Sequence, residues 1–185
     1  MNTIVYYLTL SQVFPRYHQR FGNPTLFREN FERAQRCSKC ELSGWSDSPF
    51  STDYRKCLSP CYEGFLKLHT IRANYDFWAR RFEKIYAGKA VLSVREWVGK
   101  PYGKGSSQRE IALLTREDGI GLQRLEFPYD TLSGVSVDFD KTRLSSRLEI
   151  LAHNDGLSFQ DWKEWFRGYN LSQPMAIIHF TTFRY

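Results

Sequence analysis

The stretch Lys67-Leu-His-Thr-Ile-Arg72 decides how the rest of the chain is interpreted. It sets an amine, a hydroxyl and a guanidinium along one short segment that we predict to be a strand over 65–72. An extended strand turns alternate side chains to one face, so Thr70 and Arg72 share a face. Lys67 reaches that face only if the backbone twists or bulges near Leu68. Such a trio suits an anion or a polar amide, and a solvated strand face with ordinary charges is the alternative interpretation.

The spacing Gly64-x-x-Lys67-x-x-Thr70-x-Arg72 resembles the signature of the ASCH superfamily, whose small domains are similar to the PUA fold and usually carry Gly-x-Lys-x-x-Glu-x-Arg. One extra residue separates Gly64 from Lys67. Thr70 stands where most members carry Glu, which is the variant found in the branch of N4-acetylcytidine amidohydrolases.

A second match covers residues 154–166 and the apolar segment 175–180. The amidohydrolase branch similarly has an acidic residue, a helix capped by Ser or Thr, and a closing apolar strand. The resemblance implies Lys67 as the base, Thr70 as the nucleophile and Asp155 as the acid that protonates a leaving amine. The family's acid is Glu, so Asp155 has a reach shorter by one methylene.

Two classes of function follow from this resemblance. In one, the cleft hydrolyses an N4-acylcytidine-type amide; in the other, it binds RNA or a modified nucleoside without chemistry, as PUA-like domains commonly do. We predict that the ligand contacts are Arg72, Arg95, Trp97, Lys100 and Tyr102. A third possibility is a non-catalytic protein-interaction module, since many similar bacterial and phage proteins are uncharacterised.

Charge is distributed unevenly along the chain, whose formal net charge is +6. Residues 1–110 hold 18 Lys and Arg against 10 Asp and Glu, whereas residues 111–185 hold 8 against 10. Basic side chains near interleaved aromatic residues favour a phosphate-bearing partner, because contacts to phosphate release counterions. Plain solubility is the competing explanation for a charge of this size.

The four cysteines, Cys37, Cys40, Cys57 and Cys61, all fall within a polar, turn-rich segment that we place at 36–62. Their spacing approximates the paired Cys-x2-Cys arrangement of a tetrahedral zinc site, with one extra residue in the second pair. A polar segment of this kind cannot form its own core, so a closed thiolate site would order it. We therefore predict structural Zn²⁺, with free or disulfide-forming thiols as the alternatives.

The remaining pattern predicts one α+β domain over 1–185, a PUA-like curved β-barrel with flanking helices and the small cysteine-rich insertion. Helices are expected after Asn23-Pro24, after Asn74, around Leu148 and after Ser158. Strands are expected at 4–10, 65–72, 90–97, 107–115, 120–127, 132–138 and 175–183. The apolar runs are too short to span a bilayer, and the N-terminal residues lack the pattern of a secretory signal, so we expect no membrane partner and a cytoplasmic protein.

Overall fold

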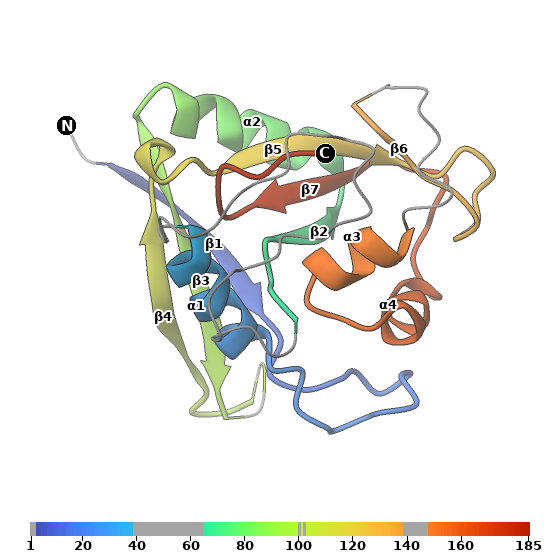
Figure 1. Ribbon diagram of the computed structural model, residues 1–185. Helices are drawn as coiled ribbons and strands as arrows, with labels where there is room; N and C mark the ends of the chain where they lie inside the picture. The colour runs from blue at the N-terminus through green and yellow to red at the C-terminus, as the bar shows by residue number, and fades with distance from the viewer. Residues whose placement is uncertain (1–2, 39–64, 100, 102, 139–147) are drawn as a thin grey trace.

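The computed structural model describes residues 3–38, 65–99, 101, 103–138 and 148–185. Figure 1 shows two β-sheets side by side, with α2 lying across the top of both and α3 and α4 beside the second sheet. The described chain is thus a mixed α+β structure, as the sequence predicted.

The first sheet has the strand order β1-β3-β4. Its strands are β1 (Ile4–Leu10), β3 (Ala90–Val98) and β4 (Ser107–Leu114). β1 runs parallel to β3, with Leu10 opposite Glu96, so the two strands end at the same edge of the sheet. β4 is antiparallel to β3, and their register shifts between Val94 and Arg95.

The second sheet has the order β2-β7-β5-β6 and is antiparallel throughout. Its strands are β2 (His69–Ala73), β7 (Met175–His179), β5 (Gly121–Glu126) and β6 (Ser136–Val137). All five residues of β7 are buried, because β2 and β5 flank the strand and both of its faces are covered. β7 is therefore the central strand that fixes the position of β2.

In the described residues, four α-helices cover these sheets: α1 (Phe27–Ser38), α2 (Tyr75–Tyr86), α3 (Leu148–Asn154) and α4 (Phe159–Phe166). The predicted caps of α2 and α4 are confirmed. The side chain of Asn74 accepts a hydrogen bond from the N–H of Phe77, and the side chain of Ser158 accepts one from the N–H of Asp161. The main apolar core of the described residues then runs from both sheets into all four helices, and a smaller cluster of Ala34, Leu66 and Leu68 lies apart from it.

Among the described residues the strands do not close into a barrel, contrary to our expectation. β1 and β2 are both edge strands, and no ladder joins them. The physical reason lies before β2, where Lys67 and Leu68 donate their backbone N–H groups to Asn30 and Asn154. That backbone is therefore committed to α1 and the end of α3 instead of to β1.

Several predicted boundaries also need correction. The strand expected at 65–72 begins at His69, the one expected at 132–138 shortens to β6, and the one expected at 175–183 ends at His179. The helix expected after Asn23-Pro24 starts at Phe27, because Leu26 has a φ of 58°. This left-handed conformation cannot belong to an α-helix.

Candidate functional site

A cavity of about 380 Å³ lies where β1 and β2 face each other without pairing. Arg72 crosses between the two strands, and its Nη2 donates a hydrogen bond of 2.6 Å to the carbonyl oxygen of Thr9. The cavity is lined by Lys67, Thr70, Arg72 and Asp155 together with several aromatic side chains. The four polar residues that the sequence singled out as base, nucleophile, ligand contact and acid therefore share one cavity.

Lys67 and Asp155 form a buried ion pair in this cavity. Lys67 Nζ donates to Asp155 Oδ1 and to the Asp155 carbonyl oxygen, each over 2.6 Å. Their side chains are only 1% and 5% exposed, so little water competes for these bonds. The backbones of the two residues also form an isolated β-bridge.

The turn after α3 brings Asp155 close to Lys67. Gly156 follows Asp155 with a φ of 81°, and a Cβ built there would lie 3.3 Å from the Cβ of Lys67. A side chain at this position would be strained by the positive φ and crowded by Lys67. The Asp-Gly sequence thus permits the close approach of the two segments.

Burial shifts both ionisation equilibria of the pair. It lowers the pKa of Lys67, and the nearby positive charge of Arg72 lowers it further, while Asp155 pulls it upward. Burial likewise raises the pKa of Asp155, against the opposing effects of Lys67 and Arg72. Because the two pKa values move toward each other, the cost of passing a proton from the ammonium to the carboxylate falls.

Phe27 completes the surroundings of Lys67. The ammonium lies 3.8 Å from the centroid of the Phe27 ring, at the first residue of α1. An aromatic face stabilises a cation at this distance.

Thr70 and Arg72 lie on one face of β2, as the alternation predicted. Both line the cavity, and Thr70 is buried. Lys67 reaches the same cavity because the regular strand starts only at His69. The break that we expected near Leu68 is therefore present as the irregular segment before β2.

Aromatic residues from five separate elements form much of the cavity wall, one of them being Phe27 of α1. Tyr7 comes from β1, Trp78 from α2, Trp97 from β3, and Trp165 from α4. Rings placed around a polar floor can hold a planar ligand by stacking. Trp78 is both buried in the core and part of the cavity lining.

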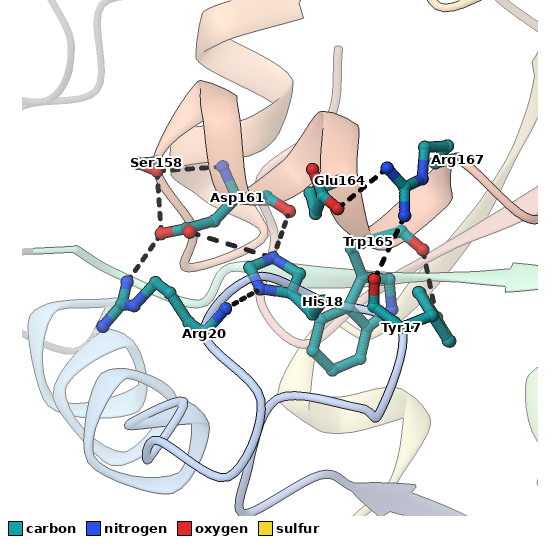
Figure 2. Close-up of polar contacts among 8 residues, drawn as sticks. All are labelled: Tyr17, His18, Arg20, Ser158, Asp161, Glu164, Trp165 and Arg167. Atoms are coloured by element: carbon teal, nitrogen blue, oxygen red, sulfur yellow. Dashed lines mark hydrogen bonds and ion pairs between the residues drawn. The ribbon is translucent and has the colours of Figure 1, made fainter.

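The Trp165 wall is held by the loop that follows β1. Figure 2 shows this loop against α4, where Arg20 Nη1 donates to Asp161 Oδ2 over 2.7 Å and Tyr17 Oη donates to the Trp165 carbonyl oxygen. His18 Nδ1 accepts from the backbone N–H of Arg20, and its Nε2 lies 3.1 Å from the Asp161 carbonyl oxygen. These contacts join segments more than 140 positions apart and fix one side of the cavity.

The remaining predicted ligand contacts are only partly placed at the cavity. Trp97 lines it, whereas Arg95 stacks on the Tyr7 ring at 4.1 Å and hydrogen-bonds Ser93, outside the cavity lining. Lys100 and Tyr102 lie outside the described residues, although Pro101 between them lines the cavity.

Most of the proposed zinc site lies outside the described residues. Cys37 belongs to the last turn of α1, and Cys40, Cys57 and Cys61 lie outside the described residues, as does most of the segment 36–62. In the described part of the chain, no group of three or more His, Cys, Asp or Glu side chains is arranged to hold a metal ion.

No family model, no curated protein and no solved structure matches this chain. Among the described helices, none is long and apolar enough to cross a membrane.

Sequence reasoning missed Phe27, Trp165 and the carbonyl of Thr9 as parts of the site. Their roles depend on where α1, α4 and β1 meet, which no local spacing specifies. A usable signal did exist for Trp165, because Trp162 and Trp165 sit three apart and Trp162 alone is fully buried. The second ring of such a pair lies toward the margin of the core.

Proposed function

We propose that this cavity binds a pyrimidine nucleoside, either free or within RNA, and hydrolyses an N4-acyl amide on a cytidine-type base. The observation that carries the proposal is the meeting of Lys67, Thr70, Arg72 and Asp155 in one cavity with aromatic walls. On this view the chain is an ASCH-type domain with a PUA-like fold, working in the cytoplasm with its four cysteines bound to zinc.

Binding follows from the mixed character of the lining. Aromatic rings provide stacking surfaces for a planar base, and Arg72 supplies a cation for a polar or anionic group of the ligand. The volume of about 380 Å³ lies in the usual range for small-molecule sites.

The chemistry would use the Lys67–Asp155 pair as a proton relay. With the proton on Asp155, the neutral amine of Lys67 takes the hydroxyl proton of Thr70 while Thr70 Oγ1 attacks the amide carbonyl carbon. The carbon–nitrogen bond then breaks, and Asp155 gives its proton to the leaving amine of the base. Water subsequently hydrolyses the acyl ester on Thr70, releasing the carboxylic acid and restoring the hydroxyl.

The test is incubation of the purified protein with N4-acetylcytidine, followed by chromatography to detect cytidine. We expect release of cytidine by the wild type, complete loss in Thr70→Val, and slower release in Asp155→Asn. Asp155→Glu restores the acid that the family normally has and should retain turnover. No turnover on any acylated cytidine would reject the hydrolase part of the proposal.

Binding without turnover is tested separately with single-stranded RNA. We expect weak binding whose affinity falls as salt rises, and weaker binding by Arg72→Ala. Absence of binding at low ionic strength, together with no affinity for any nucleoside, would favour the alternative of a protein-interaction module.

A further inference from the structure

Among the described residues, one side of the β1 backbone is paired with no strand. Ile4 donates its N–H to Lys89, which precedes β3, so the even-numbered residues of β1 turn their polar backbone groups toward β3. The odd-numbered residues Tyr7 and Thr9 therefore turn theirs to the opposite side. The carbonyl of Thr9 confirms this orientation, since it accepts a hydrogen bond from Arg72 on β2.

This side of β1 faces the cavity. The five consecutive residues 7–11 all line it, and within the described chain no strand pairs with β1 on this side. We call the backbone N–H and C=O groups of Tyr7 and the N–H of Thr9 the free edge of β1, since the Thr9 carbonyl oxygen already accepts a hydrogen bond from Arg72. Unpaired backbone groups at a sheet edge are strong hydrogen-bonding groups available to another molecule.

The side chains of the same residues are engaged elsewhere. The Thr9 hydroxyl accepts a hydrogen bond from Gln108 Nε2 on β4, and Tyr7 carries the guanidinium of Arg95 on its ring. The intervening Leu8 and Leu10 are buried in the core. What Thr9 offers to a ligand is therefore mainly its backbone.

We infer that the free edge of β1 forms hydrogen bonds with the polar edge of the ligand's ring, in the way that one strand pairs with another. The ligand class is a planar heterocycle with a donor next to an acceptor, which both uracil and cytosine present at position 3 and the neighbouring exocyclic group. This inference rests on the proposed function, and it adds the element that selects the base.

The first arm of the test compares uridine with 3-methyluridine by isothermal titration calorimetry on the wild-type chain. Methylation removes the ring donor and leaves the stacking surface and the neutral charge in place. We expect uridine to bind and the methylated nucleoside to lose roughly tenfold or more in affinity, since a backbone group is left unpaired. Equal affinities would overturn the inference while leaving nucleoside binding intact, whereas no binding of uridine or cytidine would overturn the proposed function itself.

The second arm removes one donor of the free edge. Thr9→Pro deletes the N–H that faces the cavity, and an edge strand tolerates proline where that N–H points away from its ladder. Thr9→Val is the matched control, because it loses the Gln108 contact and keeps the N–H. We expect Thr9→Pro alone to weaken uridine binding and to narrow its preference over 3-methyluridine. If Thr9→Pro folds and binds both nucleosides as Thr9→Val does, the inference is wrong, and if it does not fold, the comparison of nucleosides decides.

Discussion

Lys67 and Asp155 form a buried pair that bears on stability and, in the proposed reaction, on proton transfer. Each charge is deeply buried and depends on the other for compensation, because the pair exchanges a short hydrogen bond in a site with little water. Breaking such a pair costs more than replacing both members, since a single substitution leaves one buried charge without its partner.

We predict that Asp155→Asn lowers the free energy of unfolding by about 3 kcal/mol, and that Lys67→Met has an effect of similar size. The double variant Lys67→Met/Asp155→Asn should recover most of the loss, because it removes both charges. Urea unfolding of the four proteins gives a double-mutant cycle. Additive losses in the double variant would contradict this account of the pair.

At the scale of single residues, the sequence was informative about residue types and about which side chains alternate to the same face of a strand. Period-two logic placed Thr70 and Arg72 together and required a break near Leu68, and the structure has both features. Asp155 was matched through a resemblance, and its contact with Lys67 is present at 2.6 Å. The position of Arg95 was predicted less well. The register between β3 and β4 shifts after Val94, which changes how the side chains are placed on the sheet, and composition does not reveal such a shift.

At the scale of secondary-structure elements, two histidines lie side by side on the paired strands β2 and β7. His69 lies opposite His179 in the ladder, and both are fully buried. Burial holds the pKa of each well below its usual value, with the charge of Lys67 adding to the effect on His69. His69 Nε2 is 2.7 Å from the Tyr185 hydroxyl, and both nitrogens of His179 are without a hydrogen-bond partner among the described residues.

We predict that stability falls as the pH drops below about 6.5, because the unfolded chain then takes up protons that the folded histidines refuse. The full contribution is present above that pH and is lost progressively toward the lower folded pKa values. Each histidine adds a slope of about 1.4 kcal/mol per pH unit. His179→Phe should reduce the slope, as measured by urea unfolding between pH 7 and pH 5, and an unchanged slope would exclude His179 as a source of the pH dependence.

A second prediction at the scale of secondary-structure elements concerns the loop that follows β1 and contacts α4. Arg20→Ala removes an ion pair whose arginine side chain is 49% exposed, so we expect a loss of stability under about 1 kcal/mol. Phe14→Ala empties a fully buried site beside Trp165 and should cost about 3 to 5 kcal/mol. Thermal melting of the two variants checks which one loses more stability. A larger loss in Arg20→Ala would show that polar contacts contribute more than apolar packing where the loop meets α4.

Element types were easier to predict from the sequence than element ends. The caps at Asn74 and Ser158 located α2 and α4 because capping is a local interaction. The start of α1 was misplaced because the left-handed Leu26 follows from how the preceding loop packs against Ser11 and the core, where Thr25 donates its hydroxyl to the Ser11 carbonyl. Short strands such as β6 end where their pairing partner ends, which alternation cannot show.

At the scale of the whole molecule, the α+β class could be predicted, because short apolar segments repeat along the chain together with apolar residues at helical spacing. Two sheets in place of a barrel could not be predicted, since the outcome depends on whether β1 and β2 pair across the cavity. Their separation is what gives the protein a site, because it leaves both an open cavity and a free strand edge.

The cysteine-rich segment carries a prediction that concerns the chain as a whole. Four thiols within one polar segment should bind about one Zn²⁺ per chain, and Cys37→Ser should lower both metal content and melting temperature. Mass spectrometry for metals on freshly reduced protein is the measurement. Zinc-free protein with an unchanged melting temperature would leave these thiols without a structural role.

Binding of a pyrimidine nucleoside in the cavity between β1 and β2 is the central claim. The most direct test is calorimetric titration of cytidine into the wild type, into Trp97→Ala, which removes a cavity wall, and into Tyr129→Ala, which removes an exposed ring outside it. We predict saturable binding by the wild type and by Tyr129→Ala, and a loss of roughly tenfold in Trp97→Ala, as expected for one stacked base. Equal binding by all three proteins, or no binding by the wild type, would contradict the account.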